Sequence, residues 1–125
     1  MSVYKTTISN ITKAFLVQAV NSFVKSQGGQ IITSLTAYGG AKHDIDIGIK
    51  NQNLPNGIGF SVNSKGELEI KGDSWMQNQE FDRMRTLIPN YIKAYKATIN
   101  AKAQHPTATF NVQVQQKQVL LEVCY

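Results

Sequence analysis

The chain has 125 residues, of which 42% are hydrophobic and 17% charged, and its formal net charge is +5. These values predict one globular domain, residues 1–125, with a core large enough to fold without disulfide bonds. Cys124 is the only cysteine, which excludes an internal disulfide framework. The N-terminus lacks a signal-peptide pattern, and no apolar run reaches the roughly 18 residues of a membrane span. We therefore expect a soluble protein of the cytoplasm or of an organelle interior such as the plastid stroma, with no membrane partner.

The N-terminal part predicts a strand followed by a helix. Residues 2–9, "SVYKTTIS", are rich in β-branched and aromatic residues, which favour a strand. Residues 11–26 carry adjacent apolar pairs that recur every four residues, as expected of a helix with one buried stripe. Ser9 or Asn10 is the expected N-cap, and the glycines that follow Gln27 end the helix.

Four further strands are expected between this helix and the middle of the chain, at 30–38, 43–50, 57–63 and 67–72. Their connections are too short for parallel crossovers, so the strands should pair antiparallel. Polar and apolar residues alternate along the last three strands, which indicates one buried face. This alternation assigns Ile45, Ile47 and Ile49 to the core.

The C-terminal part predicts a second helix and a closing hairpin. Apolar residues step by three or four from Glu80 to about Lys102, and we expect a continuous helix that kinks at Pro89. Residues 108–115 and 118–125 alternate as two strands of a hairpin. The element order is then β-α-β-β-β-β-α-β-β. It predicts an α+β fold, a two-layer sandwich in which both helices cover one face of a mainly antiparallel sheet.

The segment "YGGAKHDIDIGI", residues 38–49, has the composition of a nucleotide or metal site. Asp44 and Asp46 project from one face of a strand, as magnesium ligands of a nucleotidyl transferase would. Only three residues separate the glycines from Asp44, so the phosphate-binding helix start of such enzymes has no room. We interpret Gly39 and Gly40 as a hairpin turn, and the two aspartates as a solvated face flanked by Lys42 and Lys50.

No other catalytic pattern was found. The two histidines, His43 and His105, lack the spacing of a zinc site, and neither a nucleophile elbow nor a phosphate-binding loop is present. The sequence predicts no catalytic residue, no metal and no cofactor, and the chain is expected not to be an enzyme.

Nucleic-acid binding is the alternative that the basic charge permits. A sheet with aromatic residues and nearby lysines could stack bases. The candidates are Tyr38, Phe60 and Phe110, with Lys42, Lys50, Lys65, Lys71 and Lys117. Phe60 and Phe110 are in register with aliphatic residues, however, and this favours the core for both.

Trp75 and Met76 lie in a polar connection, where large apolar residues either plug the core or form a patch for a partner. The core plug is the favoured interpretation. If they are exposed, they indicate a protein-binding surface, to which Tyr38, Lys42, Asp44, Asp46 and Lys50 are the weaker additions.

The segment from Ala37 to Gln77 resembles the core of the hypothetical chloroplast reading frame thirty-five family, a domain of unknown function from cyanobacteria and algal plastids. The similar elements are Tyr38–Gly40, Asp44–Ile49, Gly57–Val62, Gly66–Ile70, Trp75, Tyr91 with Tyr95, and Gln113–Val123. The chain departs from the family in its ending, "VLLEVCY", and in Pro89. The family has no established activity, so the resemblance implies no catalytic residue. Its members are often encoded beside an AAA-type ATPase, which implies at most an accessory role and such an ATPase as one partner.

The sequence thus predicts a non-enzymatic interaction module, an accessory or adaptor subunit of a larger complex with a protein partner. The alternative is a basic nucleic-acid-binding module.

Overall fold

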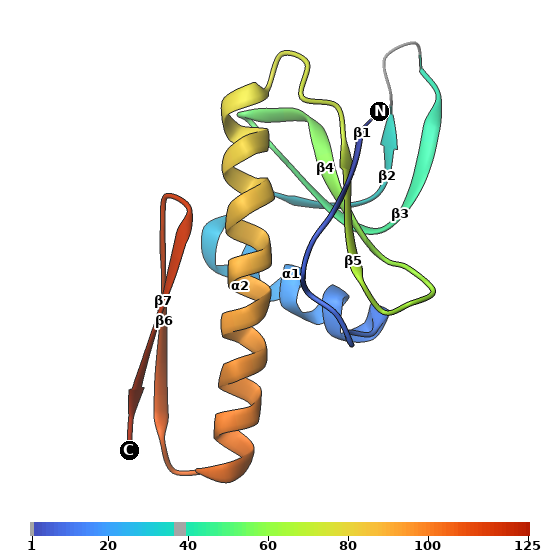
Figure 1. Cartoon of the computed structure of the whole chain (residues 1–125). Helices are drawn as coiled ribbons and strands as arrows, with labels where there is room; N and C mark the ends of the chain where they lie inside the picture. Colours follow the sequence, from blue (N-terminus) through green and yellow to red (C-terminus); the bar gives the residue numbers. More distant parts are fainter. Residues whose placement is uncertain (1, 37–39) are drawn as a thin grey trace.

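A computed structural model describes residues 2–36 and 40–125 (Figure 1). Its elements follow the predicted order and confirm the α+β class with a mainly antiparallel sheet. The bounds are β1 Ser2–Lys5, α1 Lys13–Gln27, β2 Gln30–Thr36, β3 Lys42–Asn51, β4 Leu54–Val62, β5 Leu68–Gly72, α2 Asn78–Gln104, β6 Thr109–Gln115 and β7 Gln118–Cys124.

Five strands form one antiparallel sheet in the order β1-β5-β4-β3-β2. The strands β2 to β5 follow one another as a meander, and β1 adds to β5 at one edge. The turn between β3 and β4 is shorter than predicted, because Asn51 already pairs with Leu54. The predicted turn residue Gly39 lies outside the described residues, and Gly40 has a φ of 90°.

The start of α1 differs from the prediction. Thr12, and neither Ser9 nor Asn10, is the N-cap, and its hydroxyl accepts a hydrogen bond of 3.1 Å from the Phe15 N–H. The strand β1 ends at Lys5. Residues 6–12 then cross to the helix as irregular backbone, which forms hydrogen bonds with Leu68 at the start of β5 and with Gly66 in the β4–β5 turn. Ile8 and Ile11 are buried in this crossing and anchor it to the core.

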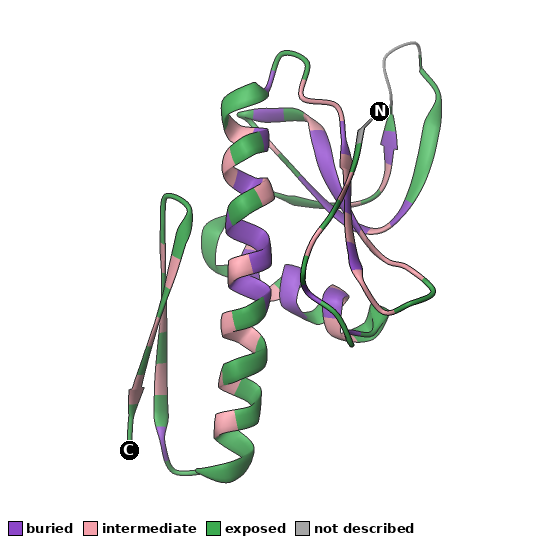
Figure 2. Ribbon diagram, viewed as in Figure 1, coloured by how far each residue is buried: buried purple, intermediate pink, exposed green. Residues whose placement is uncertain are grey.

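The main core lies between one face of the sheet and the two helices (Figure 2). Alternate residues of β3, β4 and β5 supply the sheet side, as the alternating pattern predicts. These core residues are Ile47, Ile49, Leu54, Ile58, Phe60, Leu68 and Ile70 from the sheet, Leu16, Ala19, Val20 and Phe23 from α1, and Phe81, Met84, Leu87, Ile88, Tyr91 and Ile92 from α2.

The opposite face of the sheet is also partly buried, and the predicted orientation of Ile45 is wrong. Gly48 and Gly59 point to this face, since their neighbours in sequence point into the main core. A Cβ atom at either glycine would lie 2.6 Å from the Ile45 side chain, and Leu35 packs on Gly59 in the same way. The glycines therefore let the β2–β3 hairpin fold its own apolar residues onto the sheet.

Asp46 lies where β3 separates from β4. The regular β3–β4 pairing stops at Ile47 and Phe60. One residue earlier, a carboxylate oxygen of Asp46 accepts a hydrogen bond of 2.8 Å from the Val62 N–H, and the Asp46 N–H donates to the Ser61 hydroxyl at 3.3 Å. Side chains thus replace the backbone ladder where the two strands separate. Asp46 is a structural residue rather than part of the predicted solvated face, whereas Asp44 is exposed.

The long helix α2 is continuous through Pro89, as predicted, and begins at Asn78. Its first half covers the sheet. The β6–β7 hairpin does not join the sheet but packs against α2 on the other side (Figure 1). Val112, Val114 and Val119 extend the core onto this hairpin. Most of the second half of α2 and of the hairpin is exposed or only half-buried (Figure 2).

Candidate interaction site

The connection between β5 and α2, residues 73–77, presents two large apolar side chains to solvent. Trp75 is 58% exposed and Met76 is 75% exposed. The favoured interpretation of these residues as a core plug is therefore wrong. Tryptophan and methionine are both enriched at protein interfaces, and here two exposed side chains of these types are consecutive in sequence. We call this segment the Trp75 loop.

The Trp75 loop is held in place by one buried amide. Gln77 is only 4% exposed, although it is polar. Its side-chain nitrogen donates to the carbonyl oxygens of Gly57 at 3.1 Å and Asp73 at 2.6 Å, and its side-chain oxygen accepts from the Asn56 N–H at 2.9 Å. Gln77 thereby ties both ends of the loop to the first residues of β4.

Two further hydrogen bonds fix the backbone on either side of the indole. The backbone N–H of Trp75 donates to a carboxylate oxygen of Asp73 at 3.0 Å, and the Asn56 side-chain amide donates to the backbone carbonyl of Trp75 at 2.9 Å. Met76 adopts a φ of 64°, a left-handed conformation that is rare for a residue with a Cβ atom. Such strain persists only where surrounding contacts over-determine it. The network around Gln77 provides those contacts, so the loop is pre-formed.

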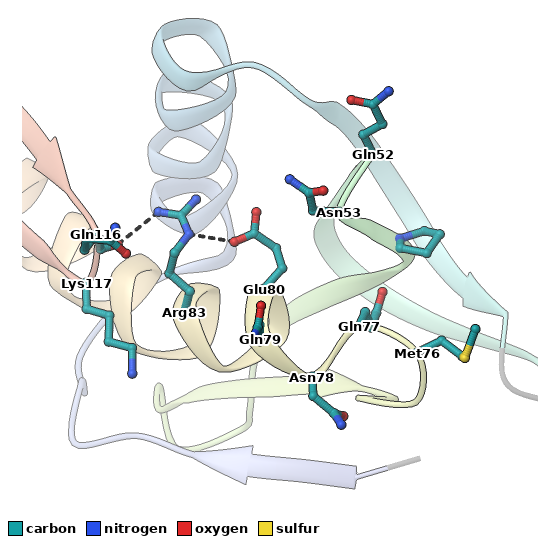
Figure 3. Close-up of a pocket in the computed structure, with 11 residues that line it drawn as sticks. Gln52, Asn53, Met76, Gln77, Asn78, Gln79, Glu80, Arg83, Gln116 and Lys117 are labelled. Atoms are coloured by element: carbon teal, nitrogen blue, oxygen red, sulfur yellow. Dashed lines mark hydrogen bonds and ion pairs between the residues drawn. The ribbon is translucent and has the colours of Figure 1, made fainter.

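A wide groove of about 980 Å³ opens on the Met76 side of the loop (Figure 3). The first turns of α2, the β3–β4 turn and the β6–β7 turn form its walls. Most of its lining is amide or charged: Gln52, Asn53, Pro55, Met76, Gln77, Asn78, Gln79, Glu80, Arg83, Gln116 and Lys117. We call this the α2 groove.

Arg83 closes one end of the α2 groove by joining two elements. Its guanidinium Nε lies 2.6 Å from a carboxylate oxygen of Glu80, and another of its nitrogens donates to the Gln116 carbonyl at 2.9 Å (Figure 3). About two helical turns further on, the Asn90 side chain donates to the Lys117 carbonyl at 3.0 Å. Arg83 and Glu80 are thus engaged in holding the hairpin turn against α2, which gives them a structural role.

A smaller hollow of about 250 Å³ lies on the Trp75 side of the loop. Alternate residues of β2 form one wall, and the Trp75 loop forms the other. Its lining consists of Ile32, Ser34, Thr36, Lys50, Pro55, Asn56, Asp73 and Trp75. We call this the β2 hollow.

The predicted interaction residues fall into separate places. The structure brings Lys50 and Trp75 together, because both line the β2 hollow. Met76 lies on the other side of the loop, in the α2 groove. Lys42 and Asp44 are exposed at the start of β3, and Tyr38 lies outside the described residues.

The candidates for base stacking do not form one surface. Phe60 is fully buried, as its register with aliphatic residues predicts, and Phe110 is half-buried in the β6–β7 hairpin. Lys65 lies in the β4–β5 turn and Lys117 in the β6–β7 turn, at opposite sides of the molecule (Figure 1). Lys71 is on β5.

Sequence reasoning missed Gln77 and Asn56, which position the loop. No local pattern marks a glutamine before a helix as buried. The only signal was the apolar pair Trp75 and Met76 in a polar connection, which needs a rigid support if it is to stay exposed.

In the ranges 2–36 and 40–125, no three histidine, cysteine, aspartate or glutamate side chains lie close enough to hold a metal ion. No helix in the same ranges has the length and hydropathy that crossing a membrane requires. Comparison of the chain with protein-family models, curated proteins and solved structures gives no match.

Proposed function

We propose that the chain is a protein-interaction module, an accessory or adaptor subunit that contacts its partner through the Trp75 loop. The observation that carries the proposal is a pair of exposed apolar side chains on a loop fixed by a buried amide network. Exposed tryptophan and methionine side chains lower the solubility of a protein. A rigid loop that exposes both is typical of a binding surface.

Rigidity adds to the affinity that such a loop can provide. A loop that is ordered before binding loses little conformational entropy when the partner binds. Aromatic side chains such as Trp75 are the residues most often found at interface hot spots, where truncation typically costs 2 kcal/mol or more. The polar α2 groove beside Met76 supports the same function, since amides and charges can form the hydrogen-bonded rim around an apolar centre.

The experiment compares capture of partners from native extract by the wild-type chain and by a double variant, Trp75→Ser with Met76→Ser. The matched control is Leu120→Ser, because Leu120 is also a large exposed apolar residue but lies on β7. We expect a stoichiometric protein that the wild type and the control retain and the double variant loses. The family resemblance makes an AAA-type ATPase one protein to look for.

Two outcomes contradict the proposal. One is a double variant that is folded by circular dichroism and captures the same proteins as the wild type. The other is a wild-type chain that elutes from native extract alone and as a monomer.

Binding of single-stranded nucleic acid is the second candidate. The adjacency of Trp75 and Lys50 in the β2 hollow supports it, because an exposed indole beside an ammonium group can stack a base and contact its phosphate. We expect this function to show as retardation of single-stranded RNA or DNA that falls steeply as salt rises. Absence of retardation at low salt rejects it.

A further inference from the structure

The strand β2 is a free edge of the five-stranded sheet. It lies at one end of the strand order and pairs only with β3. In the described part of the chain, no hydrogen bond outside the β2–β3 ladder involves its backbone. The amide and carbonyl groups on its outer side are therefore available to another strand.

This edge lacks the usual protection against strand addition. The seven residues "QIITSLT" include no charge and no proline, which are the common protective features of edge strands. A bulge does interrupt the pairing, but its extra residues are on β3. Between the pairs Ile32↔Gly48 and Ser34↔Asp44, β2 has one residue and β3 has three. The outer edge of β2 thus stays continuous.

The β2 hollow lies over the sheet face at this edge, since residues of β3 and β4 line it together with β2. Ile32, Ser34 and Thr36 line it from β2 at intervals of two residues, the spacing at which a neighbouring strand would place its own side chains. Trp75 forms the facing wall. Lys50 is exposed at the hollow and makes no ion pair within the described residues. With a chain net charge of +5, this position favours a carboxylate from the partner.

We propose that the partner of this module supplies an extended segment that adds to the sheet beside β2. An apolar side chain of that segment occupies the β2 hollow against Trp75, and an acidic side chain faces Lys50. Backbone hydrogen bonds to β2 provide affinity, and the hollow and Lys50 provide selectivity. The inference rests on the proposed function and specifies the chemistry of the segment that the site receives.

The test uses a synthetic peptide of alternating valine and glutamate at millimolar concentration, with amide hydrogen exchange of the full chain as the readout. We expect exchange of the outward amides between Gln30 and Thr36 to slow by about tenfold, as new hydrogen bonds at an edge would produce. The amides of β1, the opposite edge, should not change. Fluorescence of Trp75, the only tryptophan, should shift to shorter wavelength.

Two matched probes separate strand addition from simple attachment. A peptide with the same side chains but methylated backbone nitrogens should not bind. A peptide of alternating valine and lysine should bind more weakly, by about threefold to fivefold as expected for an exposed ion pair. The variant Lys50→Glu should reverse this order.

Unchanged exchange in β2, or equal binding of the methylated peptide, overturns the inference. So does protection of β2 that appears without peptide and grows with protein concentration, because the edge then receives a second copy of this chain. These failures leave the proposed function standing if the Trp75 and Met76 double variant still loses its partner. If that variant still binds both its partner and the peptide, the inference and the proposed function are both refuted.

Discussion

Replacement of Gln77 by alanine tests the claim that one buried amide supports the Trp75 loop. The substitution removes three hydrogen bonds, to the Gly57 and Asp73 carbonyls and from the Asn56 N–H. Gly57 is buried, so its carbonyl loses a partner where water does not easily replace it, at about 1–3 kcal/mol. Asp73 and Asn56 are half-buried, and each lost bond there costs about 0.5–1 kcal/mol. The expected loss of unfolding free energy is therefore about 3 kcal/mol.

Urea denaturation followed by circular dichroism measures this loss, with Gln79→Ala as the control. Gln79 is exposed on the first turn of α2, and its replacement should cost less than about 0.5 kcal/mol. The fluorescence anisotropy of Trp75 should also fall in Gln77→Ala, because the loop loses its anchor. A loss below about 1 kcal/mol, together with unchanged anisotropy, would show that Gln77 does not anchor the loop.

Five further substitutions test the fold that positions the site. Gly48→Ala should destabilise by about 2 kcal/mol or more in thermal melts, since the new Cβ would lie 2.6 Å from a β4 carbonyl oxygen; a variant as stable as the wild type would contradict the close packing on this face. Asp46→Ala should lower the free energy of unfolding by about 1–2 kcal/mol, because it leaves the Val62 N–H of β4 without its acceptor. Lys13→Ala should cost almost nothing, because its 3.9 Å ion pair with Asp46 is largely exposed. If Asp46→Ala and Lys13→Ala lost similar amounts of unfolding free energy, the ion pair and not the hydrogen bond to the Val62 N–H would be the stabilising contact of Asp46. Thr12→Ala should lower the free energy of unfolding by about 1 kcal/mol, and Ser9→Ala should lower it much less. A larger loss in Ser9→Ala would indicate that Ser9, one of the two residues predicted from sequence, is the N-cap.

Much of the fold could be predicted from sequence because hydrophobic periodicity reports the buried face of each element. The order of elements, the antiparallel meander and the continuous helix through Pro89 all follow from local patterns and short connections. The positions of Ile47 and Ile49 in the core follow in the same way.

Ile45 shows where such reasoning fails. Strict alternation assigns it to the main core, but the sheet has a second apolar surface that the pattern does not reveal. That surface exists because Gly48 and Gly59 leave room for Ile45 and Leu35. Glycines separated by ten residues in sequence meet only after β3 and β4 pair, so the alternation within one strand contains no information about them.

The candidate site was predicted only in part, for a similar reason. Trp75 and Met76 were identified as unusual for their polar surroundings, yet burial was the favoured outcome for both. Their exposure depends on Gln77 and Asn56, whose hydrogen bonds connect two separate segments. The adjacency of Trp75 and Lys50 likewise arises from the tertiary fold.

The central claim is that Trp75 lies in the interface with the partner. Its fluorescence tests this directly, because no other tryptophan of the chain contributes to the signal. The partner is first isolated from native extract, and the complex is then reconstituted with a form of that partner that has no tryptophan fluorescence. In this complex the emission of Trp75 should shift to shorter wavelength, and its quenching by acrylamide should fall. Emission and quenching identical to those of the free chain would contradict the claim.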